Sequence, residues 1–262
     1  HKLRQLNALQ VKPMLAGRFA LRKKYMDLKS ACKYESEGNF ERALIAYQSI
    51  EINSLSNTDK IYIKRLIAAC LFYLKKYEEA EFNFKNLLSL KELDVEELDE
   101  IEDCLNICYL YGHKQKKAFQ YFMKKIIKHE IDDLEKMWSY WYVGQYHQME
   151  NDFIKCYSAY KKSYEISHLL NITNKAFFFA HYLIAFIYLD KLKEALSEID
   201  KYEKAYENSV SFGLLKITKG IIYKIQKRQN WNEIFIEGIK EAEEARYQEN
   251  IDIGMKLKKE FG

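Results

Sequence analysis

The sequence predicts an all-α fold in which helical hairpins are stacked into an α-solenoid. The first observation behind this prediction is that the 262 residues include only nine glycines and one proline. β-Hairpins and glycine-rich phosphate loops need residues that bend the chain or adopt positive φ, so this composition disfavours both. The second observation is a helical motif that recurs with a nearly constant period, as expected for a repeat architecture.

The motif consists of an aromatic or apolar residue, a central residue three positions later, and a large apolar residue four positions after that. Its clearest copies are Phe40-Ala43-Tyr47, Tyr77-Ala80-Phe84 and Phe153-Cys156-Tyr160. The central residues of six copies are Ala43, Ala80, Ala118, Cys156, Ala195 and Ile234, at intervals of 37 to 39 residues. A small central residue lets two helices cross closely, so the motif predicts a helix packed against a partner.

A first helix is expected before each of these second helices. The expected first helices are residues 24–36, 59–74, 97–111, 135–149, 175–189 and 211–226. Turn-compatible residues such as Gly38-Asn39 and Asn151-Asp152 stand between the helices of a pair. We therefore expect about six helical hairpins with a period of about 38 residues.

Charge divides the chain into two parts. The net charge is +4, but the first 24 residues hold seven of the 42 Lys and Arg residues and no Asp or Glu, so residues 25–262 carry −3. We interpret residues 1–23 as a basic linker or capping segment, with a nucleic-acid or membrane contact as the alternative, and residues 24–262 as the repeat domain. Nucleic acid is therefore not the expected partner of the repeat domain.

The cysteines and the apolar segments of the sequence indicate the cellular compartment in which the chain is expected. The five cysteines are odd in number and include no Cys-x-x-Cys pair, which favours a reducing cytoplasm over a disulfide framework. No apolar run approaches the roughly 18 residues of a membrane span, so no membrane partner is expected.

The motifs resemble the tetratricopeptide repeat. The best match is residues 137–163, through Tyr140, Val143-Gly144, His147, Phe153, Cys156, Tyr160 and Ser163. The period of about 38 residues departs from the 34 of that family, and the proline that usually ends the second helix is missing. The resemblance implies a concave surface, lined by the first helices, that binds a peptide or protein. The chain is also loosely similar to the repeat domains of cytoplasmic peptide-pheromone receptors of Gram-positive bacteria.

Steps of three or four along the first helices give the residues expected to face a partner. These candidates are Tyr62, Arg65, Tyr73, Tyr111, Trp138, Trp141, Gln145, Gln148 and Tyr188. Trp and Tyr are enriched in binding hot spots, glutamine amides can bond a peptide backbone, and an arginine can receive a carboxylate. For the two tryptophans the alternative is burial against a neighbouring repeat or a dimer partner.

Catalytic motifs are not evident in the sequence. It contains no nucleophile elbow, Walker loop or dinucleotide fingerprint. Cys104, Cys108 and His113 suggest either part of a zinc site or, as we favour, core packing. The sequence thus predicts a non-catalytic protein- or peptide-binding module without metal or cofactor, serving as the sensor or scaffold of a larger regulatory protein. An RNA-binding helical repeat, the receptor domain of a transcriptional regulator, and a homodimer remain as alternatives.

Overall fold

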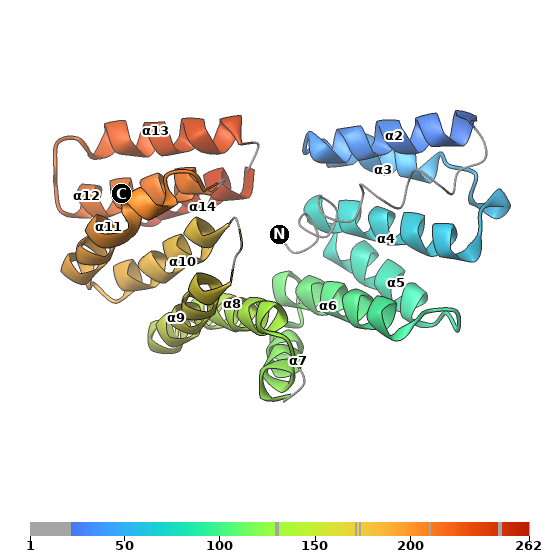
Figure 1. Cartoon of the computed structure of the whole chain (residues 1–262), viewed down its shortest axis with the longest axis horizontal. Coiled ribbons are helices and arrows are strands. Elements are labelled where there is room, and N and C mark those ends of the chain that lie inside the picture. The colour runs from blue at the N-terminus through green and yellow to red at the C-terminus, as the bar shows by residue number, and fades with distance from the viewer. Residues whose placement is uncertain are drawn as a thin grey trace. The chain divides into compact units, whose positions relative to one another are not determined.

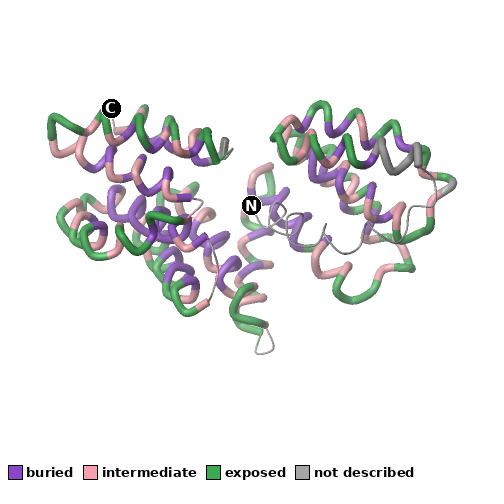
Figure 2. The backbone as a smooth tube through the Cα atoms, turned by 45° about the horizontal axis from the view of Figure 1, so that its top comes forward, coloured by how far each residue is buried: buried purple, intermediate pink, exposed green. Residues whose placement is uncertain are grey.

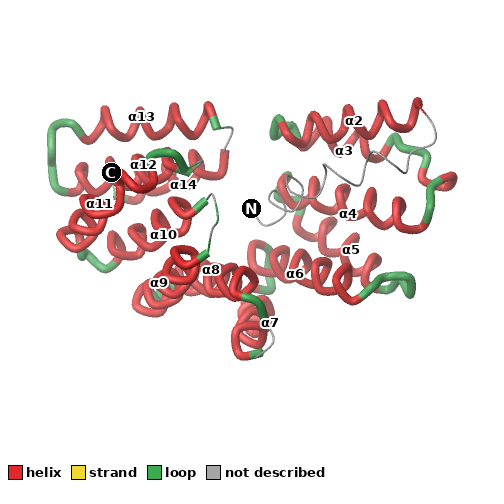
Figure 3. The backbone as a smooth tube through the Cα atoms, viewed as in Figure 1, coloured by secondary structure: helices red, strands yellow, loops and turns green. Residues whose placement is uncertain are grey.

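A computed structural model describes residues 22–128, 131–170, 172, 174–209, 211–245 and 248–261. Residues 1–21, nearly all of the predicted basic segment, lie outside this part. Within the described ranges the chain is helical and contains no strand (Figure 3), which confirms the all-α solenoid of helical hairpins. Among these helices, none combines the length and apolar character that crossing a bilayer demands.

The helices follow the predicted alternation. The first helices are α2 (Arg22–Ser36), α4 (Asn57–Tyr73), α6 (Val95–Tyr111), α8 (Asp133–Met149), α10 (Lys175–Tyr188) and α12 (Phe212–Ile225). The second helices are α3 (Phe40–Gln48), α5 (Tyr77–Leu88), α7 (Gln115–Ile127), α9 (Phe153–Leu169), α11 (Leu192–Tyr206) and α13 (Trp231–Glu244). All six predicted first helices are confirmed, with bounds within two residues. A 3-10 turn, η1 (Ile52–Ser54), and a last helix, α14 (Gln248–Glu260), were not predicted.

The chain divides into two compact units, residues 1–121 and 122–262, which we call the N-terminal unit and the C-terminal unit. In the N-terminal unit, the α2–α3 hairpin packs on α4, and α5 packs on α6 (Figure 1). In the C-terminal unit, α9 packs on α10, α10 packs on α12, and α14 packs on both α12 and α13. Neighbouring hairpins therefore bury one another's apolar faces within each unit.

The central residues of the motif lie where the helices of a hairpin cross. Five of them are fully buried, namely Ala43, Ala80, Ala118, Cys156 and Ala195. Figure 2 shows buried positions alternating with exposed ones along the second helices, as a one-sided apolar face requires. The small residue is thus explained by close packing rather than by chemistry, including at Cys156.

The sixth central residue was predicted wrongly. Ile234 is only half-buried, whereas Gly238 is buried and lies against α12. A Cβ added at Gly238 would lie 2.7 Å from both the carbonyl oxygen of Gly213 and the backbone nitrogen of Ile217. The last copy is therefore centred on Gly238, because α12 and α13 approach so closely that no side chain fits between their backbones.

Left-handed residues end five of the first helices. The φ angle is positive at Gly38, Lys75, Asn151, Asp190 and Lys227, between 54° and 75°. At each of these turns the next N–H bonds back to the last helical turn, as Lys76 does to the carbonyl of Leu71 at 2.9 Å. This arrangement satisfies carbonyl groups that the helix end leaves unpaired, so short joins suffice without many glycines.

A capping box begins α6. Asp94 Oδ1 accepts from the Glu97 N–H at 2.8 Å, and Glu97 Oε2 accepts from the Asp94 N–H at 3.2 Å. We expect Asp94→Ala to lower the free energy of unfolding by about 1 kcal/mol in urea titrations, because the Glu97 N–H at the helix end loses its side-chain acceptor. Asp94→Asn keeps an acceptor and should lose much less. An equal loss of unfolding free energy in both variants would show that the charge of Asp94, and not its capping hydrogen bond, stabilises the start of α6.

Candidate functional site

A chain of hydrogen bonds runs through the first helices of the C-terminal unit. Gln145 Nε2 donates to the hydroxyl of Tyr160 at 2.6 Å, and this hydroxyl donates to Gln148 Oε1 at 2.8 Å. Gln148 Nε2 reaches the hydroxyl of Tyr188 at 3.4 Å, and Tyr188 donates to Glu260 Oε2 at 2.7 Å. We call Gln145, Tyr160, Gln148 and Tyr188 the polar ladder. It brings together three of the predicted site residues, from α8 and α10, with Tyr160 of α9.

The two glutamines of the polar ladder lie in the C-terminal part of α8, where the helix becomes more exposed to solvent. Along α8, residues 141–144 are buried, residues 145–148 are half-buried, and residues 149 and 150 are exposed. The ring of Tyr188 stacks on Phe153 with centroids 4.4 Å apart. Burial and the bond to Glu260 raise the pKa of Tyr188, so its hydroxyl stays protonated and acts as a donor.

The two tryptophans of the same helix lie in the core. Trp138 is 1% exposed and Trp141 is 2% exposed. The Trp138 ring lies 4.9 Å from Phe178, and the Trp141 ring lies 5.3 Å from Phe177, both on α10. The prediction that these tryptophans contact a partner is therefore wrong for this structure, because α10 covers them. The packing alternative accounts for both.

In the N-terminal unit, Arg65 and Tyr62 lie together on α4. The guanidinium of Arg65 forms an ion pair with Glu100 of α6, and both side chains are less than one-fifth exposed. The same guanidinium lies 5.7 Å from the ring centroid of Tyr62, and burial raises the pKa of Tyr62 to about 12. The carboxylate that the sequence led us to expect from a ligand is thus supplied by the chain itself.

Tyr73 and Tyr111 belong to an aromatic cluster at the ends of α4 and α6. Tyr73 stacks on Phe40 at 4.3 Å, and Phe72 lies edge-on to Tyr111 at 5.8 Å. Tyr111 in turn stacks on Tyr77 of α5 at 6.5 Å. Phe40 is buried and the other rings are half-buried, and together they join successive hairpins of the unit. Each ring therefore has a packing role besides any contact with a partner.

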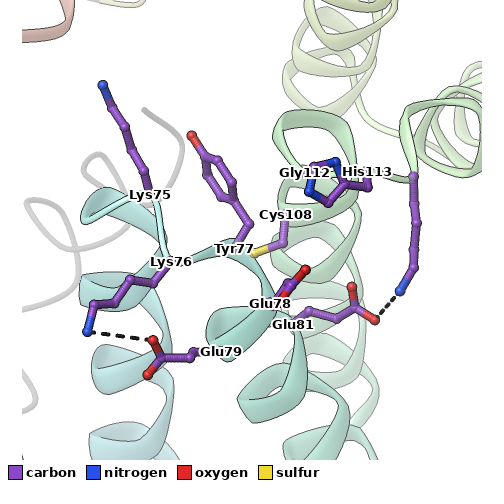
Figure 4. Close-up of a pocket in the computed structure, with 10 residues that line it drawn as sticks. Lys75, Lys76, Tyr77, Glu78, Glu79, Glu81, Cys108, Gly112 and His113 are labelled. Atoms are coloured by element: carbon purple, nitrogen blue, oxygen red, sulfur yellow. Dashed lines mark hydrogen bonds and ion pairs between the residues drawn. The ribbon is translucent and has the colours of Figure 1, made fainter.

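A pocket of about 310 Å³ lies next to this cluster, between the α4–α5 and α6–α7 turns (Figure 4). Its charged groups are largely paired, since Lys76 lies 3.5 Å from Glu79 and Lys114 pairs with Glu81. Burial alone would raise the pKa of Glu81, but hydrogen bonds from Lys114 and Lys85 lower it. The paired charges give the pocket no strong preference for anions or cations.

The cysteines singled out as possible zinc ligands lie in the core of the N-terminal unit. Cys104 is 3% exposed and Cys108 is 2% exposed. Burial raises the pKa of the Cys108 thiol, which disfavours the thiolate that zinc requires. His113 and Cys108 both line the pocket of Figure 4, whereas Cys104 does not. These positions agree with the packing interpretation.

Sequence reasoning missed Tyr160 and Glu260. Tyr160 fills the large apolar position of the repeat, and its ring is fully buried, but its hydroxyl reaches the first helix of its own hairpin. Tyr47, at the same position of an earlier copy, likewise donates to Glu35 of α2 at 2.6 Å. The presence of tyrosine instead of phenylalanine at this position was the sequence signal that could have indicated a hydrogen bond to the first helix.

Comparison with solved structures supports the repeat fold. The chain is similar to a tetratricopeptide repeat protein from Parabacteroides merdae, with a TM-score of 0.61 and 18% identity over 97% of this chain and 88% of that one. It is also similar to PlcR of Bacillus thuringiensis, solved with the peptide PapR7 and DNA, with a TM-score of 0.50 and 15% identity over 71% of this chain and 75% of that one. No protein-family model and no curated protein sequence matches the chain. The predicted resemblance to tetratricopeptide repeats is confirmed in the fold.

Proposed function

We propose that this chain is a non-catalytic, peptide-binding helical-repeat module that uses the polar ladder of the C-terminal unit. The observation that carries the proposal is the hydrogen-bonding capacity left on the ladder. Gln145 uses one amide N–H, and Gln148 uses its oxygen and one N–H. One further N–H on each glutamine and Oε1 of Gln145 have no partner among the described residues.

A peptide backbone matches this capacity. An extended peptide offers N–H and C=O groups in turn, so a pair of half-buried amides can bond it in both directions. The stacked rings of Tyr188 and Phe153 lie beside these amides and offer apolar area to a side chain. The fold of PlcR, which was solved with a peptide, adds support for a ligand of this class.

RNA is a weaker candidate. A helical repeat that binds RNA needs a basic surface with stacking aromatic residues. Residues 25–262 carry a net charge of −3, and the two tryptophans are buried. The peptide is therefore the partner that charge and burial favour.

The N-terminal unit offers a second, lesser surface to the same kind of partner. We place Tyr62, Arg65, Tyr73 and Tyr111 there. A ligand carboxylate would have to displace Glu100 from Arg65, so this surface should bind an acidic group more weakly than an unpaired arginine would.

The setting we propose for the module is regulatory. It would serve as the sensor or scaffold part of a larger regulatory protein, with the receptor of a transcriptional regulator as the narrower form. The five cysteines are free thiols in the structure, which fits a reducing compartment such as the cytoplasm. A homodimer is compatible with this role.

The test begins with selection of a phage-displayed random heptapeptide library on the full chain. The most enriched peptide is synthesised with a fluorescent label, and its Kd is measured by anisotropy. We expect Gln148→Ala to raise Kd by about tenfold, since one net hydrogen bond is worth up to about 1.5 kcal/mol. Gln229→Ala, at an exposed turn glutamine, is the matched control and should bind like the wild type.

Three results would overturn the proposal. The first is the absence of any enriched peptide, and the second is an equal Kd for Gln148→Ala and the wild type. The third is tight binding of labelled oligouridylate that weakens steeply with added salt, which would indicate RNA instead.

A further inference from the structure

The last helix, α14, reaches further into the C-terminal unit than a repeat helix should. In stacked repeats each hairpin contacts only its neighbours. Yet Glu260, at the end of α14, accepts a hydrogen bond from Tyr188 of α10 at 2.7 Å, and the ring of Phe261 lies 5.3 Å from that of Tyr188. The whole α12–α13 hairpin separates α10 from α14 in sequence. The end of α14 therefore leans across α12 toward the polar ladder.

The contact with Glu260 occupies the hydroxyl donor of Tyr188, which lies beside the amide of Gln148. The hydroxyl of Tyr188 has one proton, and it is directed to Glu260, while the hydroxyl oxygen accepts from Gln148. A peptide carbonyl at this position must replace Glu260 as the acceptor of the Tyr188 hydrogen bond. A hydrogen bond from the Tyr188 hydroxyl to a peptide carbonyl and the hydrogen bond that docks Glu260 of α14 are thus mutually exclusive.

The rest of α14 combines a close fit with one poor contact. Gly254 lies so near α12 that an added Cβ would meet Ile217 Cγ2 at 2.7 Å, and Leu257 is 1% exposed. Asn250 is fully buried, however, and neither its Nδ2 nor its Oδ1 has a partner among the described residues. A buried amide without hydrogen bonds opposes docking, so α14 is held less firmly than its apolar contacts alone would hold it.

We infer that α14 is a displaceable strap, whose C-terminal end competes with the peptide for Tyr188 and is released when the peptide binds. The inference rests on the proposed function, because Tyr188 is a ligand contact only there. It adds a direction of control: changes that loosen α14 strengthen peptide binding, and changes that tighten it weaken binding.

Hydrogen exchange of the full chain without peptide tests the docking itself. Glu260→Gln weakens the bond to Tyr188 and should speed exchange of amides 255–261 about fivefold. Asn250→Leu keeps the branching of the side chain but removes the unpaired amide, and should slow that exchange by a similar factor. Lys256→Gln, at an exposed position of α14, is the control and should leave the exchange unchanged. Unchanged exchange in both test variants would overturn the inference.

Peptide binding tests the competition. With the enriched heptapeptide, Kd should fall about fivefold in Glu260→Gln and rise about fivefold in Asn250→Leu. If Gln148→Ala weakens binding but these two variants bind like the wild type, the strap is wrong and the proposed function stands. If Gln148→Ala also binds like the wild type, or no peptide is enriched, both proposals are wrong.

Discussion

Replacement of Trp141 by alanine is expected to lower the free energy of unfolding by about 3–5 kcal/mol, because the change empties a core site the size of an indole. The side chain is 2% exposed and lies within 5.3 Å of the rings of Tyr142, Phe177 and His181. Urea titration followed by far-ultraviolet circular dichroism measures the loss.

Trp141→Phe is the control for this prediction. The indole Nε1 is buried and has no hydrogen-bond partner in the described part of the chain, so phenylalanine forfeits ring area but no hydrogen bond. We expect a loss of about 1–2 kcal/mol, well below that of alanine. If the alanine variant unfolds at the same urea concentration as the wild type, Trp141 is not a core residue and the recognition hypothesis for it returns.

The sequence located the first helices well because two independent signals agreed there. The central residues of the motif marked each second helix, and the turn residues marked its start, so the bounds of α8 were predicted within two residues. In the last copy the motif indicated the wrong central residue, Ile234, which is only half-buried, whereas Gly238 is buried. Gly238 lies at the centre of α13 because the backbones of α12 and α13 touch there. The motif expects a large apolar residue four positions after Ile234, which is position 238, so it could not indicate this backbone contact.

The candidate site was only partly predictable, because one face of α8 carries both fully buried residues and half-buried residues. Trp138, Trp141, Gln145 and Gln148 all follow the inner stripe of α8. Which of them is covered depends on α10, whose apolar residues pack over the first half of the stripe and leave the second half open. Periodicity identifies the stripe, but it does not show how far a neighbouring helix covers it.

The sequence did not predict which distant residues form hydrogen bonds with the site residues, for a related reason. Arg65 meets Glu100 and Tyr188 meets Glu260, at separations of 35 and 72 residues. The first separation is close to one repeat, so a register argument was available for it. The second requires α14, which the repeat pattern did not predict and which leaves the regular stacking.

Replacement of Gly144 by alanine should destabilise the C-terminal unit by about 3 kcal/mol, at the upper end of the usual cost of overpacking. A Cβ at this position would lie 2.4 Å from Cδ1 and 2.5 Å from Cε1 of Tyr160, whose ring is fully buried and therefore shifts only at the expense of its core contacts. The sign is informative, since Gly→Ala inside a helix ordinarily adds about 0.5–1 kcal/mol of stability. Displacing the ring would also pull its hydroxyl from Gln145 and Gln148, so peptide binding should weaken in the same variant.

A double-mutant cycle with Tyr160→Ala isolates this contact. Tyr160→Ala removes the three atoms nearest to the new methyl group, Cγ, Cδ1 and Cε1, and it leaves a cavity beside Gly144. In that background Gly144→Ala should be neutral or stabilising, because the methyl group fills part of the cavity and the helix regains its preference for alanine. The coupling between the two sites, measured by urea titration of all four proteins, should therefore be about 3 kcal/mol. Additive losses would mean that Gly144 is needed for some reason other than the ring of Tyr160. The close approach of α8 to α9 would then not be what positions the polar ladder.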